Sequence, residues 1–289
     1  MESVLIVGCG YIGRRVAALL QARGVSVTGL VHSAESAQGL RDQAVRVLQA
    51  DLDDAVPGVH WAGGFTDIFY FAPPPPRGET DARMAGFLQA LDTHAPPRRI
   101  VYISTSAVYG DCQGRWITED EPVNLATARG QRRLDAENRL RTWAEGHEVE
   151  WIVLRVPGIY GPGKLPLERL RAGTPVLREA DAPYTNRIHG DDLAAICVAA
   201  MDSTHANTLY NISDGHPGNM TDYFFRVADA AGLPRPPEVA RTEAEQVLTP
   251  GMLSFLQDSR RMNNEKLLVE LGIELQYPDL DAGLKSCFE

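Results

Sequence analysis

The chain has 289 residues and 44% hydrophobic residues, long enough for one large α/β domain and a smaller appendage because single cores stop growing near ~250–300 residues. Its formal net charge is −10 and its pI is near 5.2, which argues against nucleic acid as a partner because phosphate binding needs clustered Lys and Arg. No run approaches the ~20 apolar residues of a membrane span, so we expect a protein without a membrane partner.

Short β-rich runs alternate with helix-like segments along the first half of the chain. The runs cover residues 3–7, 26–31, 45–49, 67–72, 99–104 and 149–155, and helices are expected from Tyr11, through the thirties, over 79–94 and over the arginine-rich 128–141. This alternation implies parallel strands joined by right-handed crossovers, with helices on both faces. The predicted fold class is α/β, a doubly wound parallel sheet.

The stretch VGCGYIGRR (7–15) places Gly8, Gly10 and Gly13 directly after the first strand and at the start of a helix. In such a turn the first glycine permits the tight bend, the second lets the backbone approach a pyrophosphate, and the third lets helix and strand pack closely. Free N–H groups at the helix start, around Tyr11 and Ile12, then hold the phosphates. The motif predicts a Rossmann-type site for NAD or NADP.

The end of the second strand bears on the choice between these cofactors. An NAD-preferring site usually carries Asp or Glu there to bind the ribose 2′-OH, whereas this chain has Val31, His32 and Ser33. The missing carboxylate slightly favours NADP, with Arg14, His32 and Ser33 as partners of the 2′-phosphate. Two alternatives stay open: His32 is only a polar loop residue, or Glu35 supplies the acid if the strand runs longer.

After Tyr160 the pattern loosens into Gly- and Pro-rich sequence, then returns to a helix over 191–201 and a strand over 208–213. We expect residues 1–160, with 185–213 returning to them, to form the Rossmann domain. Residues 161–184 and 214–289 are then a small discontinuous C-terminal domain that binds substrate at the carboxyl ends of the strands, where doubly wound sheets hold ligands.

The four cysteines, Cys9, Cys112, Cys197 and Cys287, form no C-x-x-C pair. The sequence therefore indicates neither a disulfide framework nor a zinc site. Residues 1–7 lead into a strand without the basic region and apolar stretch of a signal peptide. We expect a soluble, cytoplasmic protein without a metal.

Further stretches follow in order along nearly the whole chain: ADL (50–52), YISTSAVYG (102–110), LRVPGIYGPG (154–163), NRIHGDDLA (186–194), LYNISDG (209–215) and SRRMNNEKLLVELGIE (259–274). With the glycine turn they resemble the extended short-chain dehydrogenases, the NAD-dependent epimerase/dehydratase family that acts on nucleotide sugars. The resemblance implies further cofactor contacts at Asp51, Leu52, Phe71, Ala72, Pro73, Val156 and Pro157. It also gives Thr105 the role of donating a hydrogen bond to a substrate oxygen, with a simple strand-end cap as the alternative.

The chemistry of this family requires Tyr-x-x-x-Lys on the next helix, where Lys lowers the pKa of Tyr so that the phenol can pass a proton. Aligning the family-like tail of this motif with residues 133–137 puts Arg129 at the Tyr position and Arg133 at the Lys position. Residues 111–150 contain neither Tyr nor Lys, and a guanidinium, with a pKa above ~12, cannot shuttle protons near neutral pH. The chain thus resembles atypical members that lack the dyad.

Three interpretations of Arg129 and Arg133 stay open. They are solvated residues paired with acids of their own helix, or they hold ribose and phosphate oxygens of the cofactor, or they clamp an anionic substrate. Arg132 and Arg139 point elsewhere on the helix, and we expect them at the surface.

Other polar residues near strand ends receive structural roles. Tyr109 and Tyr160 belong to blocks that family members with the dyad also contain, so packing is expected for both. His189 precedes a helix and is expected to be a structural histidine, while Arg187 is a candidate for a substrate-phosphate contact.

Two functions are compatible with this sequence. In the first, an oxidoreductase or epimerase-like enzyme uses Thr105 to polarise a substrate oxygen and Arg129 and Arg133 to stabilise negative charge; its substrate is a small molecule such as a nucleotide sugar or another anionic metabolite. In the second, a non-catalytic protein senses NAD(P) and signals to a partner. The resemblance also allows a homodimer.

Overall fold

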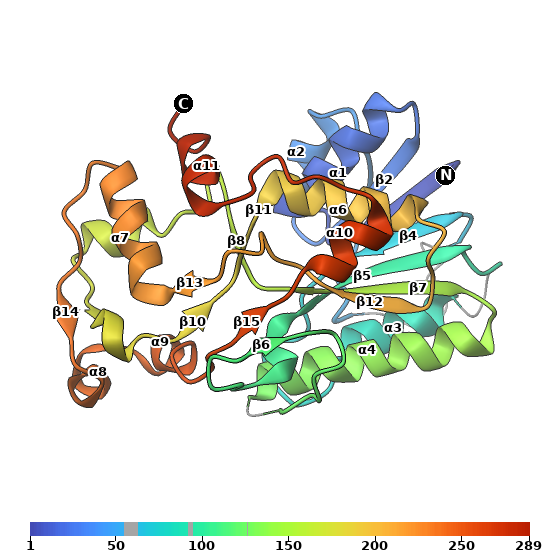
Figure 1. The fold of residues 1–289 in the computed structure, drawn as a ribbon. Coiled ribbons are helices and arrows are strands. Elements are labelled where there is room, and N and C mark those ends of the chain that lie inside the picture. Colours follow the sequence, from blue (N-terminus) through green and yellow to red (C-terminus); the bar gives the residue numbers. More distant parts are fainter. Residues whose placement is uncertain (55–62, 92–94, 126) are drawn as a thin grey trace.

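A seven-stranded parallel sheet forms the centre of the computed structural model, which describes residues 1–54, 63–91, 95–125 and 127–289 (Figure 1). The strand order is β12-β7-β5-β4-β1-β2-β3, so the chain winds outward in both directions from β1 and β4. The strands are β1 (Ser3–Val7), β2 (Ser26–Val31), β3 (Arg46–Gln49), β4 (Asp67–Tyr70), β5 (Arg99–Thr105), β7 (Glu150–Val156) and β12 (Thr208–Asn211). This arrangement confirms the predicted α/β class with a doubly wound sheet.

Helices cover both faces of the sheet because successive strand residues point to opposite sides. In β1, Val4 and Ile6 join the core under one helical layer, whereas Leu5 and Val7 join the core under the other. The first layer holds α1 (Tyr11–Ala22), α2 (Ala34–Arg41) and α6 (Gly190–Asp202), and the second holds α3 (Ala82–Leu91) and α4 (Ala128–Gly146).

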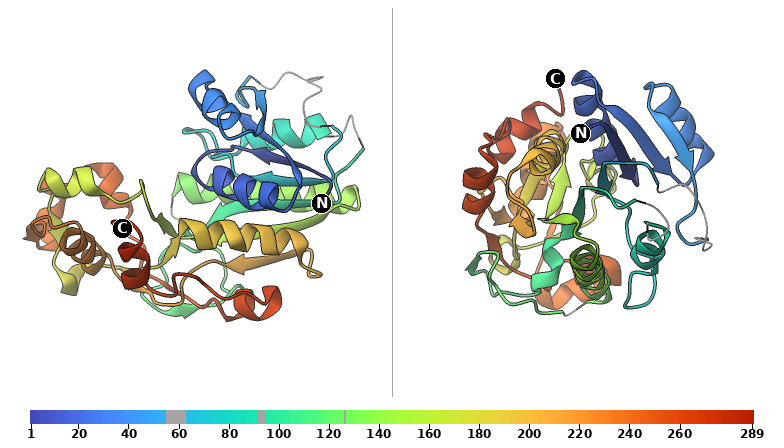
Figure 2. Two further views of the ribbon diagram at one scale, coloured as in Figure 1. Left: turned by 90° about the horizontal axis from the view of Figure 1, so that it is seen from above. Right: turned by 90° about the vertical axis from the view of Figure 1, so that its right-hand side faces the viewer.

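A smaller lobe lies beyond the carboxyl ends of the central strands (Figures 1 and 2). Short paired strands connect the lobes: β8 (Gly158–Tyr160), which follows β7, runs parallel to β11 (Arg187–His189). The remaining elements of this lobe are α5 (Leu167–Arg171), β9 (Val176–Leu177), η2 (Glu179–Asp181), β10 (Tyr184–Thr185), β13 (Gly218–Asn219), α7 (Met220–Ala230), β14 (Glu238–Val239), α8 (Arg241–Val247), α9 (Pro250–Ser254) and α11 (Leu280–Lys285).

Two C-terminal stretches return toward the sheet. The strand β15 (Arg261–Met262) pairs with β6 (Trp116–Ile117), which follows the short helix η1 (Ser106–Tyr109). The helix α10 (Glu265–Leu271) packs on α6 and β12, and its Leu267 is fully buried in the core of the sheet's lobe. Residues 265–271 therefore lie with the sheet and not with the small lobe.

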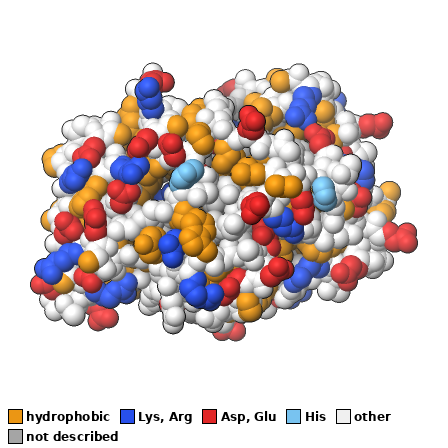
Figure 3. All heavy atoms as spheres, in the orientation of Figure 1, with side chains coloured by type: hydrophobic (Ala, Val, Ile, Leu, Met, Phe, Trp, Pro, Cys, Tyr) orange, Lys and Arg blue, Asp and Glu red, His pale blue; other side chains and the backbone are white. Residues whose placement is uncertain are grey.

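The surface is mixed in charge on the face drawn in Figure 3, where acidic and basic side chains alternate without a large patch of one sign. Within the described residues, no helix is long and apolar enough to cross a lipid bilayer. The same residues contain no group of three or more His, Cys, Asp or Glu side chains placed to hold a metal ion.

Candidate active site

The glycine turn has the geometry that a dinucleotide pyrophosphate needs. Gly8 has φ +82°, and a Cβ at this position would lie 2.6 Å from the backbone nitrogen of Ala72. A Cβ on Gly10 would meet only the Gly8 oxygen, at 4.0 Å, so the space beside it is open. Gly13 packs on β1, where a Cβ would approach a side chain to 3.1 Å. Since no side chain caps the first turn of α1, its N–H groups are available to phosphate oxygens.

The loop after β4 lies against this turn, as the resemblance implies. The Phe71 N–H donates to the Val7 oxygen at 2.8 Å. This hydrogen bond extends the pairing of β4 with β1 by one residue. Ala72 then faces Gly8 across the turn. Pro73 follows at the edge of a cavity, and its carbonyl accepts from Arg83 Nη1 at 2.9 Å.

The start of α1 carries the next two candidates. Ile12 is buried in the core, so only its backbone N–H faces the turn. The Tyr11 ring lies between two cations, with Arg15 Cζ 3.8 Å and Lys164 Nζ 5.1 Å from its centroid. Its hydroxyl is buried and has no hydrogen-bond partner among the described residues. Burial raises the pKa of Tyr11, so this phenol is a poor proton donor at neutral pH.

The residues predicted to bind the adenosine end of the cofactor lie around the start of α2. Ser33 caps this helix, its Oγ accepting from the Ser36 N–H at 3.1 Å. Arg14 Nη2 lies 3.5 Å from the Ser36 oxygen, which places the guanidinium against α2. The strand β2 ends at Val31, and Glu35 is exposed in α2, so Glu35 does not extend the strand as one alternative required.

A carboxylate nonetheless reaches this end of the site from the neighbouring strand. Asp51 Oδ2 lies 3.0 Å from His32 Nε2, so two residues that the sequence predicts to contact the cofactor touch each other. His32 is largely exposed. Leu52 is partly buried against the core next to β4.

A cavity of about 770 Å³ opens between the two lobes. Thr105, at the end of β5, and Pro157, after β7, border it on the side of the sheet, whereas Val156 is buried. Thr105 Oγ1 accepts from the Ala107 N–H at 3.2 Å and so caps η1. Its own O–H remains available to a ligand, so the cap and the substrate contact are compatible.

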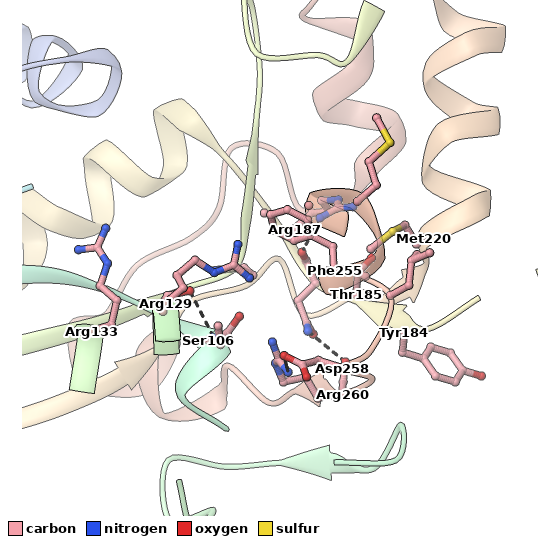
Figure 4. Close-up of a pocket in the computed structure, with 18 of the residues that line it drawn as sticks. Ser106, Arg129, Arg133, Tyr184, Thr185, Arg187, Met220, Phe255, Asp258 and Arg260 are labelled. Carbon is pink, nitrogen blue, oxygen red and sulfur yellow. Dashed lines mark hydrogen bonds and ion pairs between the residues drawn. The ribbon is translucent and has the colours of Figure 1, made fainter. Parts of the chain in front are cut away.

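Arg129 and Arg133 both line this cavity (Figure 4). Arg133 Nη1 donates to the Ile103 oxygen at 2.9 Å and to the Tyr102 hydroxyl at 3.2 Å. Arg129 extends across the cavity, with its Cζ 4.3 Å from the ring centroid of Phe255, and burial lowers its pKa.

The acids of α4 are engaged elsewhere. Asp135 pairs with Arg139 at 2.7 Å, and Glu137 pairs with the buried Arg155 at 2.8 Å. Within the described part of the chain, no ion pair involves Arg129 or Arg133. The geometry thus does not support the interpretation that pairs them with acids of their own helix.

Arg132 does not lie at the surface, where the sequence analysis expected it. It is only 9% exposed and lines the cavity, and its Nη1 donates to the Gly78 oxygen at 2.6 Å. The expectation of a surface position is wrong because the loop before α3 covers this face of α4. Arg139 is exposed, as expected.

The other candidates have structural partners. Tyr109 donates to Asn211 Oδ1 at 2.7 Å, and burial raises the pKa of Tyr109 to about 12. Tyr160 is buried and donates to the Asp279 oxygen at 3.2 Å. Both tyrosines therefore pack, as the sequence predicts.

His189 is fully buried, and burial lowers its pKa. Its Nδ1 accepts the Asp191 N–H at 3.2 Å, which leaves the proton on Nε2, 3.3 Å from Ser286 Oγ. A histidine in this tautomer cannot take a proton from the serine. It caps α6, in agreement with a structural role.

The small lobe contributes cavity residues that no motif indicated. Arg169 of α5 and Arg260 before β15 bring two further cations, and β9, α7 and the segment around α9 bring an apolar wall. Arg260 belongs to the stretch SRR (259–261), which the sequence analysis quoted, but only the fold shows that it lies opposite α4. Short helices and two-residue strands have no clear hydrophobic period, so the wall could not be found from the sequence.

Comparison with known proteins identifies the sheet's lobe. A family model described as NAD(P)H-binding matches residues 8–204. The chain belongs to this NAD(P)H-binding family. The predicted NAD(P) cofactor is confirmed, and the choice between NAD and NADP stays a prediction.

Similar proteins extend over nearly the whole chain. Protein YeeZ of Escherichia coli (strain K12) is 28% identical over 296 residues, covering 96% of this chain and 97% of the relative. A UDP-glucose 4-epimerase of Corynebacterium glutamicum is 24% identical over 315 residues, covering 97% and 92%. The structure of a functionally unknown conserved protein from Silicibacter pomeroyi has a TM-score of 0.87 and 28% identity, covering 100% of this chain and 98% of the other. The predicted likeness to the epimerase/dehydratase superfamily is confirmed.

Proposed function

We propose that this chain is an NAD(P)-dependent oxidoreductase that acts on an anionic substrate in the cavity between the lobes. The observation that carries the proposal is the pair Arg129 and Arg133, which line this cavity beside Thr105 without a carboxylate partner among the described residues. Charges inside a cavity are stabilised when a ligand of opposite charge binds.

Thr105, Arg129 and Arg133 have separate roles in the proposed hydride transfer. The nicotinamide of the bound cofactor supplies or accepts the hydride. Thr105 donates its O–H to the substrate oxygen, and Arg129 holds the negative charge that develops there. Arg133 is bonded to the end of β5 and fixes the position of α4 against Thr105. No side chain of α4 gives up a proton at neutral pH, so a proton for the product oxygen comes from solvent through the Thr105 hydroxyl.

NADP is the cofactor that the adenosine end supports better. Arg14, held against the start of α2, offers a cation to a 2′-phosphate. Asp51, the acid at this end of the site, contacts His32 through its Oδ2, 3.0 Å from His32 Nε2. Calorimetric titration with NADP and NAD tests this preference, and Arg14→Leu should remove it while leaving NAD binding unchanged.

Turnover tests the main proposal. Purified protein with NADPH should reduce an anionic member of a panel of aldehydes, ketones and UDP-sugars. Arg129→Leu and Thr105→Val should each lower kcat/KM by roughly 10²–10³-fold, the usual effect of removing one donor to a developing oxyanion. Arg139→Leu, on the exposed face of α4, is the matched control. Cofactor binding without turnover, unaffected by Thr105→Val, would instead favour a cofactor-sensing protein.

A further inference from the structure

The cavity between the lobes is lined by arginines and by an apolar set of side chains. Among the described residues, its charged side chains are six arginines and a single acid, Asp258, in a chain whose overall charge is −10. The arginines are Arg129, Arg132, Arg133, Arg169, Arg187 and Arg260. Asp258 Oδ2 lies 3.3 Å from Arg260 Nη1, which leaves the other five without a carboxylate partner among the described residues.

Arg187 is one of the cations that line the cavity (Figure 4). Its guanidinium stacks on the Tyr223 ring at 4.0 Å, and burial lowers its pKa. The chain makes room for this group, because a Cβ on Gly158 would lie 2.0 Å from Arg187 Nη1. The Nε atoms of Arg132, Arg169 and Arg187 are buried and have no hydrogen-bond partner among the described residues. These arginines line the cavity, where an anionic ligand can accept hydrogen bonds from their accessible N–H groups.

The cavity also has an apolar wall, whose Phe255 and Phe224 rings lie 4.3 Å from Arg129 Cζ and from Arg169 Cζ, respectively. This wall comes from β9, α7 and the segment around α9, and its side chains are Val176, Leu177, Met220, Phe224, Leu248, Met252, Phe255 and Leu256. Of the threonines on this wall, Thr221 donates its Oγ1–H to the Leu177 oxygen at 2.6 Å, whereas Thr249 Oγ1 accepts from the Met252 N–H at 3.3 Å and keeps its own O–H. A sugar or a nucleobase would lose its hydrogen bonds to water here and regain few of them.

We propose that the ligand is an amphipathic anion, with a carboxylate or phosphate head at Arg187 and a hydrocarbon body against Leu177, Leu248 and Met252. This inference rests on the proposed function only in taking the cavity as the substrate site. A volume of about 770 Å³ is typical of small-molecule sites. The substrate class is then an apolar acid or phosphate ester, not a nucleotide sugar.

Calorimetric titration of the NADP-loaded protein tests the contributions of the arginines and of the apolar wall separately. The ligands are inorganic phosphate, butyl, hexyl and octyl phosphate, octanoate, octanol and UDP-glucose. Each added CH₂ should tighten binding by up to about fourfold, the factor that corresponds to burying one methylene. Octyl phosphate or octanoate should bind more tightly than octanol and UDP-glucose, and the stronger of the two identifies the head group. Affinity that does not change with chain length, or tighter binding of UDP-glucose, would overturn the proposal.

Two variants locate the binding. Arg187→Leu should weaken octyl phosphate binding at least tenfold without weakening octanol, whereas the control Arg139→Leu should change neither. Met252→Glu, in the apolar wall, should weaken octyl phosphate more than inorganic phosphate, and circular dichroism verifies that it folds. Octyl phosphate binding that survives Arg187→Leu contradicts the placement. Hydride transfer is measured separately, so binding without turnover rejects only the proposed function, and turnover without chain-length dependence rejects only this inference.

Discussion

Arg133 occupies a position from which its side chain reaches back over the end of β5. Its Nη1 donates to the Ile103 oxygen and to the Tyr102 hydroxyl, and its Cζ lies 5.8 Å from the centroid of the Tyr102 ring. Arg129, one turn earlier, extends into the cavity instead. Arg129 thus faces the cavity, and a lysine in place of Arg133 keeps a donor for the Ile103 oxygen, so a tyrosine and a lysine can replace the two arginines.

The double variant Arg129→Tyr with Arg133→Lys restores the dyad of the resembling family. We expect it to fold and to bind NADP(H) within about a factor of three of the parent, because substitutions outside packed regions usually change free energies by under ~0.5 kcal/mol. Calorimetric titration with NADP measures this. An unfolded protein, or lost cofactor binding, would reject the mapping of the two arginines onto the dyad positions.

Gly158 supports the Arg187 guanidinium from the paired strand. Gly158→Ala places a Cβ 2.0 Å from Arg187 Nη1, so the guanidinium has to move. We expect a loss of about 1–3 kcal/mol in the free energy of unfolding, as for other overpacked sites, and weaker binding of anions in the cavity. Urea unfolding measures the first effect. In the control Gly146→Ala, the new Cβ meets no atom within 4 Å, and equal losses in both variants would exclude the steric cause.

At the scale of elements, α4 carries the arginines because its start is fixed. Thr127 Oγ1 accepts the Gly130 N–H at 3.1 Å, and a Cβ on Gly130 would lie 3.1 Å from the Ala107 oxygen of η1. The first turns of α4 therefore lie tightly against the residues that follow Thr105. The Thr127 cap and the close approach of Gly130 to η1 together fix the start of α4, and so fix where Arg129 and Arg133 enter the cavity.

Removing the cap tests this role. Thr127→Ala should lower the free energy of unfolding by about 1 kcal/mol, the usual cost of losing an N-cap, whereas Thr127→Ser keeps a hydroxyl and should stay close to the parent. Urea unfolding compares the three proteins. If Thr127→Ala and Thr127→Ser lose stability equally, the threonine methyl group and not the cap is responsible.

The elements of the sheet were predictable from the sequence, and those of the small lobe were not. β1, β2 and α1 coincide with their expected ranges because each is a buried apolar run or a helix bounded by glycine. The arginines of α4 could be placed on a helix, but Arg132 was misplaced because the covering loop is distant in sequence. The apolar wall comes from short segments at 176–177, 220–224 and 248–256, which only tertiary packing brings together. The domain boundaries at 160 and 214 stay a prediction.

At the scale of the whole molecule, Asp214 lies where the two lobes meet. Its N–H donates to the Arg187 oxygen at 2.9 Å, its Oδ1 accepts from the His216 N–H at 2.9 Å, and its Oδ2 has no partner among the described residues. Burial raises the pKa of Asp214 to about 6, against the lowering effects of the His216 N–H and of the His216 and Arg187 charges. The folded protein therefore holds a proton on this carboxyl more tightly than the unfolded chain does.

The direction of the pH dependence follows from this raised pKa. The contribution of Asp214 to stability is fully present below its unfolded value of about 3.8 and is lost as the pH rises through about 6. Asp214→Asn keeps the acceptor for His216 and removes the titration. Its free energy of unfolding should match that of the parent near pH 4 and exceed it by on the order of 1–3 kcal/mol at pH 7. Urea unfolding at several pH values measures this difference between the two free energies of unfolding. The contributions of titrating groups that both proteins share, such as Asp81 and Asp192, cancel in it. A difference that stays constant from pH 4 to 7 would show that the carboxyl does not titrate in this window, and that the lobes meet around a charged Asp214.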